Sequence, residues 1–440
     1  MKQEIDADII VIGGGLAGTF SAIAAKRTNP EADVWLIERF GYLGGMATAG
    51  YVFPFMKYWG KNNGNDSKYK RLSGGLFQNM LERMHKKGYT EKKARRKNFY
   101  TRFDPMMMRC ILDDMVLEAG VKILFNAIVN KVNYDNKPTE KLKKIQSIKI
   151  QTKAGEIEGN SKLFVDATGD ADIIYHAKAE FEMGREKDGL VQPATMNFRI
   201  GNISILGAGR RHIGKKVREY KQNGNELTPR DDCLKFIGKS RKEMHFNQTR
   251  VAGYDFTDPF EMTEAEIEGR KQVDNFVQFL RNEIRGYKHS SVMNIASTLG
   301  VRESRRIIGE YQIKAEDLIN GKLFDDRIAL GNYSIDIHDP KGSAETEIVH
   351  FPKGHYYSIP YRATIPKGLK NVLVAGRPIS SSHRAHSAIR IMPICSAIGH
   401  GVGVAMGLLT KEENKEKNNV RNIDIEQLQQ TLRKQKAKID

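Results

Sequence analysis

A glycine-rich turn between a strand and a helix constrains this chain more than any other feature of its sequence. Residues 8–12 (Asp-Ile-Ile-Val-Ile) indicate a buried strand, and the alanine-rich segment up to Arg27 indicates a helix. Between them stand Gly13, Gly15 and Gly18 in the spacing Gly-x-Gly-x-x-Gly. The first glycine permits the tight turn, the second lets a pyrophosphate approach the backbone, and the third lets the helix pack closely on the strand.

A second strand, residues 33–38, completes a βαβ unit and ends in an acidic residue. Glu38 stands 20 positions after Gly18, where a carboxylate can accept hydrogen bonds from ribose hydroxyls. Strand, glycine turn, helix, strand and acid therefore occur in the order that a dinucleotide site requires. A glycine turn that merely connects a strand to a helix would not need the acid at this distance.

Later segments favour a flavin over a nicotinamide dinucleotide. A second glycine-rich turn, residues 39–48, follows Glu38 directly, and strands at residues 163–166 and 371–376 each end in small residues that a cofactor can approach. Pro393 stands at the expected first turn of a glycine-rich helix. The free N–H groups of such a helix start can stabilise negative charge on a reduced flavin.

Together these segments resemble the FAD-dependent oxidoreductase family of the glutathione-reductase-like flavoprotein superfamily, which is distantly similar to the flavoprotein subunits of succinate dehydrogenase and heterodisulfide reductase. The resemblance implies an α/β fold with a discontinuous Rossmann-like FAD-binding domain, an inserted α+β substrate domain, and FAD as cofactor. The motifs that carry it are Gly13-x-Gly15-x-x-Gly18 with Glu38, Gly41-x-x-Gly44-Gly45-x-x-Thr48, Asp104-Pro105, Asp166-Ala-Thr-Gly-Asp170, Gly300-Val-Arg-Glu-Ser-Arg-Arg306, Pro360-Tyr-Arg362, and Val374-Ala-Gly-Arg377 through Pro393.

The residues implied to bind FAD follow these motifs along the chain. They are Gly13, Gly15, Leu16, Ala17, Gly18, Glu38, Arg39, Gly44, Gly45, Met46, Ala47, Thr48, Val129, Ala167, Thr168, Gly169, Gly376, Arg377, Pro393 and Ile394.

Two departures from the distant relatives matter. Covalent attachment of flavin in the succinate dehydrogenase relatives uses a histidine just before the glycine doublet, and residues 38–45 contain none, so we expect non-covalent FAD. The three cysteines, Cys110, Cys233 and Cys395, are too far apart for an iron–sulfur run, a zinc site or a redox pair, and we expect no metal. This cysteine usage favours a reducing, cytoplasmic compartment.

The motifs divide the chain into expected domains. We assign the FAD-binding domain to residues 1–55, 100–180 and 355–412, and a substrate or cap domain to residues 181–354. Residues 57–97 are basic with few apolar anchors and predict surface helices and a loop over the flavin, whereas residues 413–440 predict a charged tail with one short helix. Within the cap, Thr263-x-x-Glu266 is typical of a capping box at the start of a long helix.

Candidate catalytic residues must lie near the flavin ring, because the flavin takes the electrons while the protein manages protons and charge. His383 and His386 lie between the last strand of the FAD domain and the helix at Pro393, so either can take a substrate proton while hydride goes to flavin N5. Arg302 and Arg390 are candidates for binding a substrate carboxylate through the guanidinium fork.

The strongly basic composition, 71 − 53 = +18, does not by itself identify a partner. We expect a small polar or anionic organic substrate, no specific nucleic acid and no membrane, since the apolar stretch Ile391–Leu409 contains Pro393, His400 and several glycines. Two alternatives remain at this point: a flavin-dependent RNA-modifying enzyme, and a flavin-binding subunit without catalysis.

Overall fold

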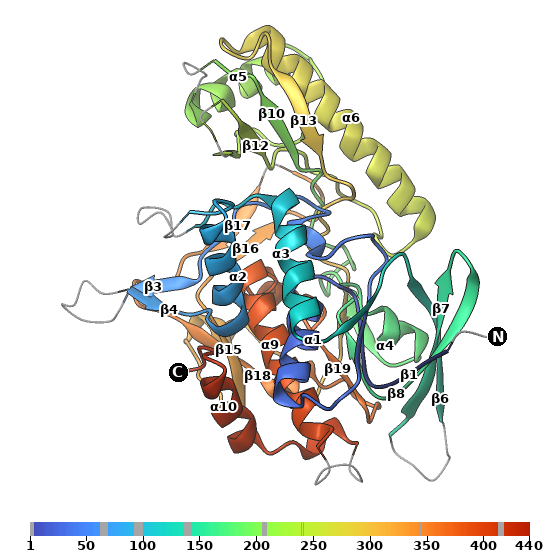
Figure 1. Ribbon diagram of the computed structural model, residues 1–440. Coiled ribbons are helices and arrows are strands. Elements are labelled where there is room, and N and C mark those ends of the chain that lie inside the picture. The colour runs from blue at the N-terminus through green and yellow to red at the C-terminus, as the bar shows by residue number, and fades with distance from the viewer. Residues whose placement is uncertain are drawn as a thin grey trace.

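The computed structural model describes residues 4–61, 69–91, 100–135, 142–204, 209–238, 240, 242–343, 345–411 and 418–440. Its largest sheet has seven strands in the order β5-β2-β1-β8-β7-β6, with β19 also paired to β8 (Figure 1). Strands β1, β2, β5, β8 and β19 are parallel, whereas β6 and β7 add an antiparallel extension to β8. The bounds are β1 (Glu4–Ile12), β2 (Val34–Ile37), β5 (Lys122–Leu124), β6 (Ile128–Asp135), β7 (Lys144–Thr152), β8 (Gly155–Asp166) and β19 (Val372–Val374).

Strand β8 joins parts of the chain that are far apart in sequence. Its first half pairs with β7, and its last residues pair with β19, where Phe164 stands opposite Val372. The carboxyl ends of β1, β8 and β19 therefore meet at one edge, and each is followed by small residues. In parallel sheets this edge is where ligands bind. The predicted α/β fold with a discontinuous Rossmann-like domain is confirmed.

Helix α9 (Met392–Leu409) is the buried centre of the helical layer. It packs against α1 (Leu16–Thr28), α2 (Gly75–Lys86) and α10 (Ile425–Lys434), and α3 (Pro105–Glu118) packs against α1 and α2. By length and hydropathy α9 qualifies as a membrane span, but 89% of it is buried inside the protein.

Three glycines one turn apart bring α9 and α1 into close contact. A Cβ atom at Gly399 would lie 2.1 Å from the carbonyl oxygen of Ala17, and one at Gly403 would lie 2.2 Å from that of Ser21. At Gly407 the corresponding distance, to the Ala25 oxygen, is 2.6 Å. Any side chain on this face would push the helices apart, so the close packing that positions the start of α1 depends on these glycines.

A second sheet forms the centre of a cap above the main body (Figure 1). It is antiparallel, in the order β11-β12-β10-β13, and has its own apolar core, which includes Phe198, Phe246 and Phe276. Its elements are β10 (Phe198–Gly201), α5 (Arg210–Gln222), β11 (Lys235–Ile237), β12 (Met244–Phe246), α6 (Pro259–Glu283) and β13 (Ser291–Ile295).

Helix α6 begins earlier than its sequence predicts. Asp258 caps it by accepting hydrogen bonds from the N–H groups of Phe260 and Glu261. Glu266, expected in a capping box, instead accepts hydrogen bonds from Thr298 and Leu299. The predicted capping box was wrong, because an aspartate followed by proline already starts the helix one turn earlier.

The cap is also smaller than residues 181–354. Its separate apolar core draws on residues 191–301 together with Tyr51, whereas Ile307, Ile335 and Tyr357 belong to the core of the main body. The remaining elements of that body are β9 (Phe181–Met183), β14 (Arg305–Ile307), α7 (Ala315–Ile319), β15 (Arg327–Gly331), β16 (Ile335–His338), β17 (Thr346–Val349), β18 (Tyr357–Pro360), η2 (Tyr361–Thr364), α8 (His383–Ile389), η1 (Gly45–Ala47), α4 (Asp172–His176) and η4 (Val420–Asn422).

The basic segment 57–97 differs from expectation as well. Its described part contains the hairpin of β3 (Trp59–Lys61) and β4 (Tyr69–Arg71), followed by α2, which buries Leu76, Phe77 and Met80 among other apolar residues. These side chains anchor α2 in the main core. Its apolar residues recur at helical spacing, a signal that the basic composition of the segment obscured.

Candidate functional site

The two glycine-rich turns lie side by side and form one backbone cradle. The N–H of Gly44 donates to the carbonyl oxygen of Gly14 over 2.8 Å, and Gly15 pairs with Gly44 in an isolated parallel bridge. Gly13 has a φ of 100°, and a Cβ atom there would lie 2.3 Å from the Ala167 oxygen. No side chain caps α1 at its N-cap Gly15, so the first N–H groups of this helix are available to an anion.

Glu38 closes one side of the cradle. Its buried carboxylate accepts hydrogen bonds from the N–H of Gly14 at 2.5 Å and of Phe40 at 2.8 Å. Burial raises the pKa of this carboxyl, and the two N–H groups oppose that rise. The carboxylate is therefore held rigidly where a ribose would meet it.

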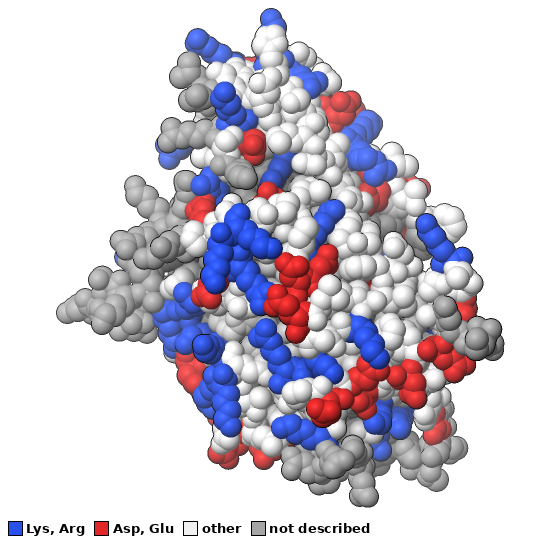
Figure 2. Space-filling view, viewed as in Figure 1, with Lys and Arg blue, Asp and Glu red and all other residues white. Residues whose placement is uncertain are grey.

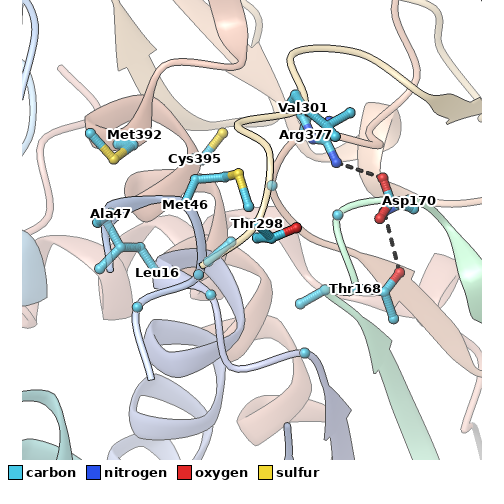
Figure 3. Close-up of a pocket in the computed structure, with 18 of the residues that line it drawn as sticks. Leu16, Met46, Ala47, Thr168, Asp170, Thr298, Val301, Arg377, Met392 and Cys395 are labelled. Atoms are coloured by element: carbon cyan, nitrogen blue, oxygen red, sulfur yellow. Dashed lines mark hydrogen bonds and ion pairs between the residues drawn. The ribbon is translucent and has the colours of Figure 1, made fainter. Parts of the chain in front are cut away.

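A first cavity opens from this cradle (Figure 3), and most of the predicted cofactor residues line it. These are Gly13, Gly15, Leu16, Ala17, Glu38, Arg39, Gly44, Gly45, Met46, Ala47, Ala167, Thr168, Gly169, Gly376 and Arg377. The other lining residues were not predicted to bind FAD, although Asp170, Val301 and Ala375 stand in the motifs quoted above. They are Phe40, Asp170, Phe256, Met262, Thr298, Leu299, Val301, Ala375, Met392 and Cys395, with Arg390 expected only as a substrate ligand.

Five predicted cofactor residues lie outside this lining. Gly18 faces the main chain of Gly13, consistent with helix-on-strand packing, and Thr48 donates to the carbonyl oxygen of Leu43 at 2.7 Å. Val129 belongs to the edge strand β6. Pro393 and Ile394 are buried in the first turn of α9, where Met392 and Cys395 face the cavity instead.

An ion pair stands at the wall of the first cavity (Figure 3). Arg377 contacts Asp170 at 2.6 Å and also donates to the carbonyl oxygen of Val301 at 2.6 Å. Burial alone would raise the pKa of Asp170, but Arg377 and other cations outweigh it and lower that pKa. Because Val301 belongs to the segment leaving the cap, this pair ties the cap to the cofactor site.

A second cavity, of about 460 Å³, lies between the cap and the main body. It shares five lining residues with the first: Met46, Val301, Arg377, Arg390 and Met392. The two cavities are therefore neighbours, and a ligand in the second lies beside whatever fills the first. The other polar side chains that line the second cavity are Thr195, Asn197, Arg230, Asp232, Asn247, Arg302, Tyr333, Asp336, His338 and Thr346.

Arg302 and Arg390 are partly buried at this junction and make no ion pair with any described residue. Arg302 donates to the carbonyl oxygen of Pro193 at 2.5 Å and to Thr195 Oγ1 at 2.7 Å, both uncharged acceptors. Arg390 has only a long contact of 3.4 Å to Gln192, and its buried Nε has no partner among the described residues. Burial, and then the charge of Arg390, lowers the pKa of Arg302.

The neighbouring arginines are different. Arg230 forms two hydrogen bonds to Asp232, at 2.8 and 3.0 Å, and Arg377 is paired with Asp170. Buried charges in proteins are normally paired, because an isolated one loses its hydration without compensation. Arg302 and Arg390 therefore present positive charge that a bound anion can neutralise.

The structure does not place His383 or His386 beside either cavity, contrary to the sequence prediction. His383 Nδ1 lies 2.9 Å from Oε1 of Glu303, a fully buried carboxylate that also pairs with Arg306. His386 is fully buried, and burial followed by nearby arginines lowers its pKa well below the usual value. Both side chains point into the body from α8, and neither is among the residues that line the two cavities.

The family described as FAD dependent oxidoreductase matches residues 8–432. Similar solved structures include a geranylgeranyl bacteriochlorophyll reductase-like protein from Thermoplasma acidophilum (11% identity, 99% of this chain and 85% of that one, TM-score 0.45). Another is the p-nitrophenol 4-monooxygenase PnpA from Pseudomonas putida DLL-E4 (10% identity, 98% and 84%, TM-score 0.45).

A third is CmlS, a flavin-dependent halogenase (10% identity, 99% and 62%, TM-score 0.46). No curated protein matches the chain. Since the family match spans nearly the whole chain and its motifs form the backbone cradle, the protein is an enzyme of the FAD-dependent oxidoreductase family, with FAD as its cofactor.

Proposed function

We propose that this enzyme transfers electrons between non-covalently bound FAD in the first cavity and a small anionic organic substrate in the second. FAD, when bound, supplies the acceptor for a hydride at its N5 atom. The five residues shared by the two cavities support this arrangement, because ligands in the two cavities would be neighbours.

The residues of the first cavity fit FAD. The uncapped start of α1 and the N–H of Gly45 are open to the pyrophosphate, whereas the N–H of Gly44 is used to hold the cradle together. Glu38 offers a carboxylate to the ribose. At the start of α9, Pro393 has no N–H and the N–H of Ile394 donates to the carbonyl oxygen of Ile391. The positive end of the helix dipole beside Met392 can still stabilise negative charge on the reduced ring.

The proposal of an anionic substrate rests on Arg302 and Arg390, two partly buried guanidinium groups that line the second cavity without an ion pair to any described residue. The overall positive charge does not support this proposal, because Lys and Arg are interspersed with Asp and Glu on the face shown in Figure 2. A carboxylate is planar and accepts two parallel hydrogen bonds from a guanidinium. It would supply the direct ion-pair partner that neither guanidinium has among the described residues, where Asp336 acts on them only across the cavity.

Anaerobic titration of the yellow enzyme with small organic compounds tests this proposal. We expect the flavin to be bleached by one or more hydroxy acids or amino acids, which carry a carboxylate beside an oxidisable carbon. Sugars and simple amines, which lack the anion, are the matched comparison. Bleaching by neutral or cationic compounds alone would contradict the proposal.

The mode of attachment gives a separate prediction. Because residues 38–45 contain no histidine, acid precipitation should release the flavin into the supernatant. Absorbance of supernatant and pellet near 450 nm measures the division. Flavin that stays with the washed pellet would show a covalent bond from another residue.

Replacing Glu38 by alanine should weaken FAD binding by about 1–3 kcal/mol, since the N–H of Gly14, the N–H of Phe40 and the ribose hydroxyls lose their acceptor. Fluorescence titration of the apoprotein with FAD measures the change. Glu31→Ala, which removes an exposed carboxylate at the turn before β2, is the control and should leave affinity unchanged. An unchanged affinity in Glu38→Ala would show that the ribose is held elsewhere.

A further inference from the structure

Three polar side chains from one short segment line the second cavity. Tyr333 precedes β16, and Asp336 and His338 belong to it. The hydroxyl of Tyr333 donates to Oδ2 of Asp336 over 3.0 Å, and Nε2 of His338 lies 3.8 Å from Oδ1 of the same carboxylate. Asp336 is therefore flanked on both sides within the cavity that also contains Arg302 and Arg390.

The contacts of His338 fix its tautomer. A guanidinium has only donors, so the 3.0 Å hydrogen bond from Arg250 Nη2 requires His338 Nδ1 to be the acceptor. The proton of the neutral ring then resides on Nε2, the atom that faces Asp336. Burial, followed by the charges of Arg302, Arg390 and other arginines, lowers the pKa of His338 and keeps the ring neutral.

These contacts leave one proton acceptor in the segment. Tyr333 is already a donor, and His338 has its accepting nitrogen occupied by Arg250. Oδ1 of Asp336 accepts no hydrogen bond from any described residue. The backbone N–H of Asp336 donates to Ser387 Oγ over 3.1 Å, which fixes the strand against α8.

We propose that Asp336 is the catalytic residue that accepts the substrate's proton, with Tyr333 and His338 as positioning residues. The inference rests on the proposed function, because it requires a substrate in the second cavity. It assigns to Asp336 the role that the sequence suggested for His383 or His386.

For a substrate H–C–X–H, where X is oxygen or nitrogen, bound FAD would be the acceptor of two electrons and Asp336 the acceptor of one proton. The hydrogen on carbon leaves with its electron pair to the oxidised flavin, and the proton on X goes to Oδ1 of Asp336. The electron pair of the X–H bond becomes the second bond of C=X. The substrate loses two electrons and two protons in total, the flavin gains two electrons and one of those protons, and Asp336 later returns the other to water.

The experiment compares Asp336→Asn and Tyr333→Phe with a matched pair of controls. Tyr311 donates to Asp317 over 2.7 Å, and neither of these residues lines either cavity, so Tyr311→Phe and Asp317→Asn change the same chemistry elsewhere. Two quantities are measured in the holoenzyme. The first is the maximal anaerobic rate of flavin reduction by the compound that bleaches the wild type. The second is the dissociation constant of benzoate, a carboxylate that flavin does not oxidise, obtained from the change in flavin absorbance.

Asp336→Asn should slow reduction by about 10²- to 10⁴-fold, the usual contribution of a general base. It should bind benzoate at least as tightly as the wild type, because a negative charge has been removed from the cavity. Tyr333→Phe should lose about tenfold in rate with unchanged benzoate affinity. Both controls should match the wild type.

A rate for Asp336→Asn within threefold of the wild type would overturn the inference. Loss of benzoate binding together with loss of rate would also overturn it, since that result indicates a structural role. If the wild type binds no benzoate and no carboxylate bleaches it, the proposed function fails, and this inference fails with it.

Discussion

Replacing Gly403 by valine is expected to prevent normal packing of the helical layer and to lower the free energy of unfolding by about 3 kcal/mol or more. A Cβ atom at this position would lie 2.2 Å from the carbonyl oxygen of Ser21 and 2.8 Å from the Cβ of Ala24. A main-chain oxygen within a helix cannot move aside, so α1 and α9 must separate. The start of α1, which we propose to bind the pyrophosphate, would then be displaced.

Chemical denaturation and the FAD content of the purified protein measure this effect. Ala397→Val adds the same kind of bulk to a partly exposed position of the same helix and serves as the control, with an expected loss below about 1 kcal/mol. A Gly403→Val protein with the wild-type unfolding midpoint and full FAD content would contradict the packing described for α1 and α9.

Replacing Arg390 by methionine should weaken benzoate binding by about 2–5 kcal/mol, the usual cost of removing one partner of a buried, hydrogen-bonded charge pair. Arg390 lines both cavities and has no carboxylate partner among the described residues, so its charge is available to the ligand. Titration of the holoenzyme, followed by flavin absorbance, measures the change.

Arg384→Met is the matched control for that variant. Arg384 belongs to the same helix region, α8, but is exposed and paired with Glu347 at 2.8 Å. Its loss should leave benzoate affinity within about twofold of the wild type, as expected for a surface ion pair. Equal affinities in Arg390→Met and the wild type would place the anion away from the junction of the cavities.

The cofactor cradle could be predicted from the sequence because its parts are local. Gly13, Gly15 and Glu38 follow strands directly, and the carboxyl ends of parallel strands meet at one edge whatever the loops do. The same logic located Ala167 and Gly376 at the ends of β8 and β19, although more than 200 residues separate them. These positions depend on strand order alone.

Residues contributed by the cap could not be predicted in this way. Thr298, Leu299 and Val301 reach the first cavity only because the segment leaving the cap sheet returns across it. Thr298 and Leu299 stand in no motif, and the motif Gly300-Val-Arg-Glu-Ser-Arg-Arg306, which contains Val301, did not indicate that this segment reaches the cofactor. Phe256 and Met262 likewise come from around the start of α6. Their positions are set by packing between two separate cores.

The error about the histidines has a specific cause. The sequence correctly suggested that residues 383–390 approach the cofactor, since Arg390 at the end of α8 lines both cavities. It did not show which face of α8 is turned inward. His383 is turned toward the carboxylate of Glu303, which lies 80 residues earlier in the chain, and His386 is enclosed in the main body. A contact between residues so far apart in sequence leaves no local pattern around α8. Tyr333 and Asp336 carry no motif, so only the fold identifies them.

Benzoate and benzamide together test most directly whether an anion-binding substrate cavity lies beside the flavin. The two have the same shape, but benzamide is neutral. We expect benzoate to perturb the flavin spectrum and to bind at least 30-fold more tightly than benzamide, and we expect this preference to vanish in Arg390→Met, since an unpaired, partly buried guanidinium discriminates by charge. Equal binding of the two compounds to the wild type, or a preference that survives in Arg390→Met, would contradict the claim.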